Sequence, residues 1–204
     1  MVAVVNKRVI LESELDQAIR VQFLLQGKVL KNDQPEASGA QAVLDQLIDR
    51  SLLEQQIADP TVLDPTPEEV AARIQEVRAQ LPGAATDEGW KKMLAAYGLT
   101  QEDVENHFVS EFRVLRFVDL RFRGLVRVDK ASIASYYEEK LLPELRRKGV
   151  ATPPLAEVSG RIEKILVEER VDSMLSEWLQ TLRVQAHIEK IMSSGNSRRN
   201  GVKP

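Results

Sequence analysis

The stretch LAEVSGRIEKILVEERVDSMLSEWLQTLRVQAHIEKIM, residues 155–192, decides the fold. Its apolar residues recur at steps of three and four, which predicts a long helix with most of these residues on one side. They are Ile162, Ile165, Leu166, Met174, Leu175, Trp178, Leu179 and Leu182. From Ala186 the pattern alternates at period two, which indicates a short strand. A helix that ends in a strand cannot complete its own hydrogen-bond ladder, so this segment requires partners earlier in the chain.

The N-terminus provides partners for that strand. Residues 3–5 and 8–10 are predicted to be two short strands on either side of Asn6-Lys7, and Asn tolerates the positive φ of a tight hairpin turn. A two-stranded hairpin is marginal by itself, so we expect the segment with Ile188 and Ile191 to add a third strand. A helix follows from Glu12, with Leu15, Ile19 and Phe23 on its predicted inner face.

The rest of the chain is predicted to be mainly α-helical. Turn-forming residues at 26–37 indicate a mobile loop, and Thr66-Pro67-Glu68-Glu69 is a strong helix start because it combines a cap, an N1 proline and an N3 glutamate. We expect helices over residues 38–59, 67–81, 90–97, 101–123 and 130–137, and a short helical turn from Pro143. The predicted organisation is a single domain over 2–192 and a disordered tail over 193–204.

The long helix at 101–123 is apolar on two sides. One stripe consists of Val104, Phe108, Phe112, Leu115 and Phe122. Val109, Phe117 and Leu120 lie on a different side, which is typical of a helix between two neighbours or one that offers a face to a partner. Together with Trp90, these three residues are candidates to line a hydrophobic groove for a polypeptide, and the alternative for each is plain core.

Composition and motifs exclude several functions. With 43% hydrophobic residues the chain can build a core, and the absence of cysteine excludes disulfides and thiolate catalysis. No phosphate-binding, metal-binding or nucleophile motif is present, so we expect no catalysis, cofactor or metal, and we interpret His107 and His187 as structural. A net charge of −3 gives no drive toward nucleic acid, and no stacking aromatics interleave with the arginine series Arg113, Arg116, Arg121, Arg123 and Arg127.

Export and membrane insertion leave little trace in the sequence. No apolar run approaches the roughly 20 residues of a membrane span, so no span is expected. No leader-like segment is visible, because Val2-Ala3-Val4-Val5 is followed directly by Asn6 and Lys7. A leader removed from before Val2 would look the same.

The order of these segments resembles the SurA-like periplasmic chaperones. The start VAVVNKRVILESELD, residues 2–16, is similar to the hairpin and first helix of that family, and VLDQLIDRSLL, residues 43–53, resembles its second helix. Further similarities lie at Leu94 to Thr100, at Asp129 to Glu138 with its Tyr136-Tyr137-Glu138, and at Glu177 to Glu189. Together they cover about residues 2–192.

One departure from the family is large. SurA-like chaperones carry one or two parvulin-type prolyl isomerase domains before the closing helix, whereas here Lys148-Gly149-Val150-Ala151-Thr152-Pro153-Pro154 crosses that gap directly. No isomerase residue can therefore be carried over. The resemblance implies a periplasmic, non-catalytic chaperone that holds unfolded polypeptides, with outer-membrane or envelope proteins as clients. It also implies that two subunits could exchange terminal elements to form a homodimer. The alternative function is a structural or adaptor module that docks one folded partner.

Overall fold

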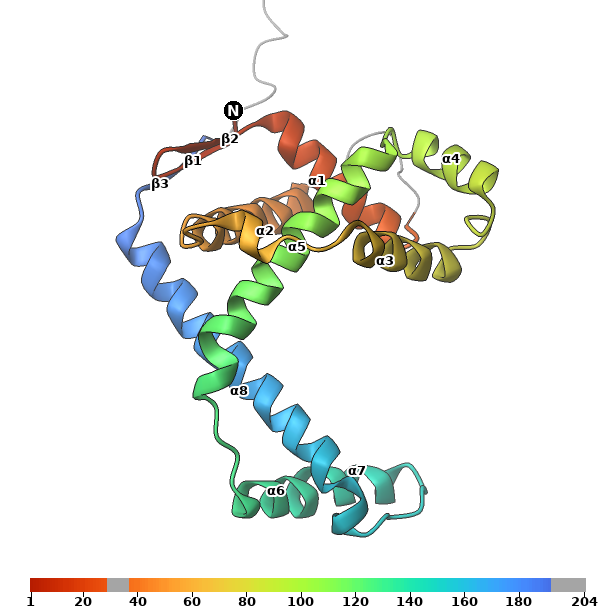
Figure 1. Ribbon diagram of the computed structural model, residues 1–204, viewed down its shortest axis with the longest axis vertical. Coiled ribbons are helices and arrows are strands. Elements are labelled where there is room, and N and C mark those ends of the chain that lie inside the picture. Colours follow the sequence, from red (N-terminus) through yellow and green to blue (C-terminus); the bar gives the residue numbers. More distant parts are fainter. Residues whose placement is uncertain (29–36, 192–204) are drawn as a thin grey trace, which may run out of the picture. The chain divides into compact units, whose positions relative to one another are not determined.

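The computed structural model describes residues 1–28 and 37–191 (Figure 1). The predicted tail at 193–204 and most of the predicted loop at 26–37 lie outside these residues. The described residues form two compact units, one of residues 1–28, 37–114 and 182–191 and the other of residues 115–181. The single domain predicted over 2–192 stays a prediction. A single domain would require that the two units unfold together in one cooperative transition. Within the described residues, no helix combines the length and apolar character that crossing a membrane requires.

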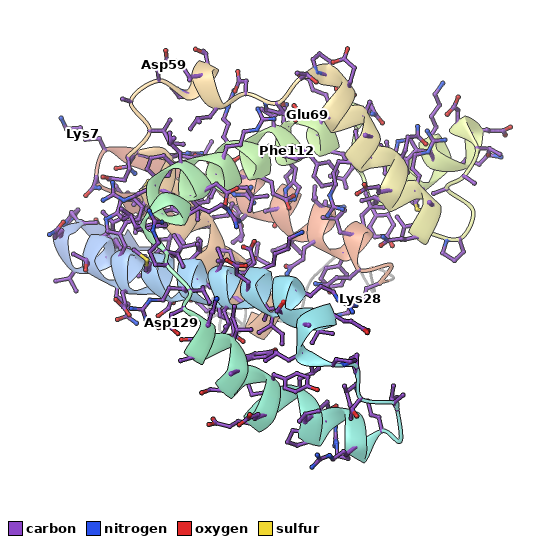
Figure 2. The ribbon with its side chains drawn as sticks, turned by 60° about the horizontal axis from the view of Figure 1, so that its bottom comes forward. Lys7, Lys28, Asp59, Glu69, Phe112 and Asp129 are labelled. Atoms are coloured by element: carbon purple, nitrogen blue, oxygen red, sulfur yellow. The ribbon has the colours of Figure 1, made fainter. Side chains whose placement is uncertain are left out.

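A small antiparallel sheet joins the two ends of the chain in the first unit, as predicted. β1 (Ala3–Val5) is central, with β2 (Arg8–Ile10) on one side and β3 (Ile188–Lys190) on the other. Val4 pairs with Val9 in β2 and with Glu189 in β3. Asn6 adopts the predicted left-handed conformation with φ 57°. Its neighbour Lys7 is exposed at the turn (Figure 2).

Polar contacts fix the C-terminal segment to α2 (Ala37–Glu54). Arg183, near the end of α8 (Leu155–Gln185), donates from Nε to Asp49 Oδ1 at 2.6 Å, and Lys190 Nζ donates to Asp45 Oδ1 at 2.6 Å. The hydrogen bond from Lys190 lowers the pKa of the Asp45 carboxyl, although partial burial opposes this. The closing helix and strand therefore contact both the sheet and the second helix of the chain.

The main core of the first unit is built by helices from the N-terminal half. These are α1 (Glu12–Leu25), α3 (Pro67–Gln80), α4 (Asp87–Ala96) and α5 (Gln101–Phe122), and a 3-10 turn, η1 (Pro60–Leu63), precedes α3. Phe108 of α5 is 1% exposed and is the largest fully buried side chain among the described residues. Its fellow core residues are Val21, Leu24, Val70, Ile74, Val77, Leu81, Ala84, Trp90, Leu94, Leu99 and Val104.

Local sequence signals explain where these helices begin, and less well what they bury. The capping box predicted at Thr66 is present, with the backbone N–H of Glu69 donating to Thr66 Oγ1 and Glu69 accepting from the backbone N–H of Thr66 (Glu69 is labelled in Figure 2). The inner face of α1 differs from the prediction, since Val21 and Leu24 are buried beside Ile19. The predicted α2 is too long, because it ends at Glu54 and not just before Pro60.

The second unit is built from the end of α5, the short helices that follow it and most of α8. The short elements are η2 (Arg123–Leu125), α6 (Lys130–Tyr136), the π-helical turn η3 (Tyr137–Leu141) and α7 (Leu142–Arg147). Asp129 caps α6 as predicted, accepting from the backbone N–H of Ser132 at 2.7 Å (Figure 2). Because this hydrogen bond favours the ionised carboxylate, the pKa of Asp129 is lowered.

The two long helices each bury different sides along their length. For α8 this corrects the prediction that most apolar residues lie on one side, and for α5 it corrects the place of Leu115 in the first of the two predicted stripes. In α8, Ile162 and Val171 are both buried, yet nine positions at 3.6 residues per turn place them about half a turn apart. In α5, Leu115 continues the side of Phe108 but is 54% exposed, whereas Val118 is buried. In α5 the neighbours change at Leu115, where the chain passes from the first unit to the second. Ile162 and Val171 both lie in the second unit, so in α8 the buried side changes within one unit.

Candidate functional site

An apolar pocket lies within the second unit. Its volume is about 310 Å³, within the roughly 300–1,000 Å³ of typical ligand pockets. The residues that line it come from α6, η3, α7, the connection to α8 and the first turns of α8. They are Tyr136, Leu141, Leu145, Val150, Ala151, Pro153, Val158, Arg161, Ile162 and Ile165.

The connection between α7 and α8 is held in place by a hydrogen bond and a glycine. Tyr137 Oη donates to the carbonyl of Pro153 at 2.7 Å, which joins η3 to the segment just before α8. Gly149 has φ 65°, a left-handed conformation that a residue with a Cβ adopts only at a cost, and it ends α7. This geometry places Val150 and Pro153 opposite α8, so that the chain closes one wall of the pocket.

The pocket can accept apolar groups from solution. Val150 is 53% exposed and Ile165 is 42% exposed, so its wall presents apolar surface to water. Arg161 is the only charged residue among those described that line it. Charged groups lie on the neighbouring helices: Lys140 pairs with Glu169 at 3.7 Å, and its ammonium also lies 5.1 Å from the centre of the Tyr136 ring. The arrangement is an apolar hollow bordered by charge.

The four residues predicted from the sequence fall into two groups in different units. Trp90 and Val109 lie in the first unit, where Trp90 is 4% exposed and donates from Nε1 to Gln101 Oε1 at 2.6 Å, and Val109 packs against the main core. Phe117 and Leu120 lie in the second unit. The Phe117 ring contacts Trp178 at 5.8 Å between ring centres, and Leu120 is 78% exposed.

The sequence did not point to the apolar pocket because much of its wall falls where the pattern predicts only a break. Residues 149–154 contain glycine and two prolines, and they carry no periodic signal. Leu141 and Leu145 are four residues apart, a spacing that places both on one side of a helix. This is a weak signal, because it lies next to a predicted helical turn of only a few residues at Pro143. Ile162 and Ile165 were assigned to a stripe that packs on the rest of the chain.

Structural contacts engage three side chains with acid–base or cationic character, His107, Arg121 and Arg123. The His107 ring packs edge-on against Phe108 with 5.4 Å between ring centres, and burial lowers the pKa of His107 to about 4, aided by Arg50 and Arg73. Arg121 stacks over Trp178 at 4.1 Å from the ring centre. Arg123 pairs with Glu168 and Asp119, which raises its pKa. In the part of the chain that the structure describes, no group of three or more His, Asp or Glu side chains could hold a metal ion.

Comparison with protein families identifies the class of this chain. The family described as SurA-like N-terminal domain matches residues 1–116. This match covers more than half of the 204 residues, and the chain therefore belongs to the SurA-like N-terminal domain family. The match covers the sheet's hairpin, α1 to α4 and most of α5, and it stops close to the end of the first unit's continuous part at Val114. A comparison with curated proteins gives no match.

Proposed function

We propose that this protein is a non-catalytic holdase, a chaperone that binds unfolded polypeptides and keeps them from aggregating. The observation that carries the proposal is the apolar pocket of the second unit, which presents Val150 and Ile165 to solvent in a chain of the SurA-like N-terminal domain family. By the same resemblance the clients are outer-membrane or envelope proteins and the compartment is the periplasm. No chemical step is part of the proposal.

The physical demands on a holdase agree with this pocket. An unfolded client exposes apolar side chains whose burial is favourable by about 25 cal/mol per Å². A pocket of about 310 Å³ accepts one or two such side chains without requiring a particular sequence. The binding is correspondingly moderate, and this suits a chaperone that must release its client.

The proposal is tested by aggregation of a chemically denatured outer-membrane barrel protein, followed by light scattering on dilution. The test variant is Ile165→Glu, which places a charge on the exposed side of the pocket. The matched control is Val184→Glu, on the same helix, where an equally β-branched residue is 86% exposed and does not line the pocket. Both positions are exposed, so we expect each substitution to change stability by only about 0.5 kcal/mol.

We expect the wild type and Val184→Glu to suppress aggregation at a few-fold molar excess. Ile165→Glu is expected to require about tenfold more protein, because burial of one apolar side chain contributes about 1.5 kcal/mol to the binding free energy. Equal suppression by both variants would remove the pocket from the proposal. Failure of the wild type at any excess would remove the holdase function. Turnover in a proline-isomerisation assay would contradict the proposed lack of catalysis.

The residues predicted from the sequence keep a place in the proposal as further client contacts. Leu120 is the most accessible of them, and Phe117 lies three positions away on the same helix. Val109 is partly buried against the core of the first unit, and Trp90 would reach a client only if that core opened.

The proposal also includes a homodimer formed by exchange of terminal elements. In the chain described, β3 pairs with β1 of the same molecule, 183 positions earlier by the Val5–Ile188 pairing. An exchanged strand would make the same hydrogen bonds to a second copy, so that a dimer would need no new interface chemistry. Light scattering over a concentration series is expected to show a dimer, and a monomer at every concentration would contradict the exchange.

A further inference from the structure

A second cavity, within the first unit, has a different chemical character from the apolar pocket. It measures about 440 Å³ and is lined by residues of α1, α2 and α5, together with Arg8 of β2 and two residues near η1. Half-buried apolar residues, including Leu47 and Ile57, form part of its wall, and charged and polar side chains form the rest. Its volume lies in the range of pockets that hold peptides and small ligands.

Most charged side chains around this cavity already have partners. Arg8 pairs with Glu54 and, at 3.5 Å, with Glu14. Glu54 also accepts a hydrogen bond from Ser110 Oγ at 2.6 Å. Arg113 pairs with Asp64, which raises the pKa of Arg113. Each of these charged groups therefore already has an oppositely charged partner.

Asp103 is satisfied as well. Its Oδ2 accepts from the backbone N–H of Thr100 at 2.7 Å, and its Oδ1 accepts from the side-chain amide of Gln17. His107, also in the wall, is neutral at pH 7 because burial lowers its pKa to about 4.

Arg50 is the exception. Within residues 1–28 and 37–191 its guanidinium has no hydrogen bond and no ion pair, although it is half-buried and lines the cavity. The positive charge of Arg50 helps to lower the pKa of His107, so this charge acts on groups inside the first unit. An unpaired guanidinium with five donors, partly removed from water, favours an anion with two acceptor oxygens. The cavity therefore offers one guanidinium with free donors beside an apolar wall.

We infer that this cavity binds the C-terminal carboxylate of an extended polypeptide, with Arg50 donating to the carboxylate and the last side chain lying against Leu47 and Ile57. A chain end presents a carboxylate and an apolar side chain on one residue, which is the combination that the cavity offers. An acidic side chain within a polypeptide would bring two flanking peptide groups with it into the same space. The inference rests on the proposed function only for the source of the carboxylate, because a holdase meets extended chains.

The test uses a short fluorescently labelled peptide that ends in leucine, prepared as the free acid and as the C-terminal amide. Fluorescence anisotropy at pH 7 gives the affinity of each for the wild type. A charge-assisted hydrogen bond to a guanidinium predicts a preference of about tenfold for the free acid. Since this comparison needs only the wild-type protein, it does not depend on whether a variant folds.

Variants then assign the preference to one residue. We expect Arg50→Gln to bind acid and amide alike, Arg50→Lys to keep part of the preference, and Arg146→Gln to behave as the wild type. Arg146 is a suitable control because it is exposed on α7 in the other unit and does not line the cavity. Circular dichroism and thermal unfolding check that each variant is folded.

Three results would overturn the inference. They are equal affinity of the wild type for acid and amide, a full preference retained by Arg50→Gln, and binding of N-acetylleucine as tight as that of the peptide, since the last would assign the cavity to free small acids. Aggregation suppression does not enter this experiment. If the preference for the free acid is absent while the protein still suppresses aggregation, the proposed function stands and the carboxylate site does not. If the preference is present while aggregation is not suppressed, the carboxylate site stands and the proposed function does not.

Discussion

Acidification to pH 5 is expected to destabilise the first unit through His107. Its ring is mostly buried on α5, with Arg50 of α2 and Arg73 of α3 contributing positive potential, and burial is the largest cause that lowers its pKa to about 4. Glu111, one turn along the helix at 3.8 Å from Nε2, would favour the charged form but does not offset burial. In the unfolded chain the same group returns to a pKa of about 6.5.

The sign follows from these two values. Below pH 6.5 the unfolded chain takes up a proton that the folded chain refuses until about pH 4, so stability is complete above pH 6.5 and falls between the two values. One pKa unit corresponds to about 1.4 kcal/mol. The full loss is therefore about 3 kcal/mol, and about 2 kcal/mol of it occurs between pH 7.5 and pH 5, where most carboxylates remain ionised.

Urea unfolding of the wild type and of His107→Gln at pH 7.5 and pH 5 measures this loss. We expect the free energy of unfolding of the wild type to fall by about 2 kcal/mol more than that of His107→Gln over this interval. His187→Gln is the control, because His187 is exposed at the entry to β3 and its replacement leaves His107 in place. An equal fall in the wild type and in His107→Gln would refute the assignment of the acid sensitivity to this histidine.

Two further substitutions test the packing and the turn. Phe108→Ala removes the largest fully buried side chain and is expected to lower the free energy of unfolding by about 3–5 kcal/mol in denaturant titration, and a loss below about 1 kcal/mol would contradict its place in the core. Asn6→Ala is expected to cost about 1–2 kcal/mol, because Asn6 has φ 57° and its Oδ1 accepts from the backbone N–H of His187 at 2.9 Å. The adjacent Lys7→Ala should change stability by less than about 0.5 kcal/mol, and equal losses in both variants would argue against a role of the turn conformation.

The sequence predicted the elements whose signals are local. Asn6-Lys7 between two predicted strands identified the hairpin, because few residues adopt the conformation that this turn requires. The box at Thr66 identified the start of α3, since its hydrogen bonds form between neighbours in the chain. The sequence analysis expected the C-terminal strand to pair with the hairpin, because a two-stranded hairpin is only marginally stable by itself. The structure confirms this, since β3 pairs with β1.

The sequence could not predict which side of a long helix is buried at each point along it. Leu115 continues the side of α5 that carries Phe108, and periodicity gives no sign that the first unit ends at Val114. Ile162 and Val171 face different directions on α8 because neighbours distant in the chain cover different sides of one helix.

The apolar pocket was missed for a related reason. Its wall combines the start of α8 with a glycine- and proline-containing connection, and only tertiary structure brings Val150 and Pro153 next to Ile162. The cavity at Arg50 was missed because its character depends on which neighbouring charges are already paired. Pairing of this kind cannot be read from spacing.

The most direct test of the account is photo-crosslinking from the apolar pocket. A photoreactive phenylalanine derivative replaces Leu145, which lines the pocket, and in a matched protein it replaces Val184, which is 86% exposed and does not. Each is illuminated with one outer-membrane barrel protein, either denatured or folded. The account predicts crosslinks from position 145 to the denatured client alone and few from position 184. Crosslinks from 145 to the folded client would favour an adaptor that docks a folded partner, and equal crosslinking from both positions would contradict a client site in the pocket.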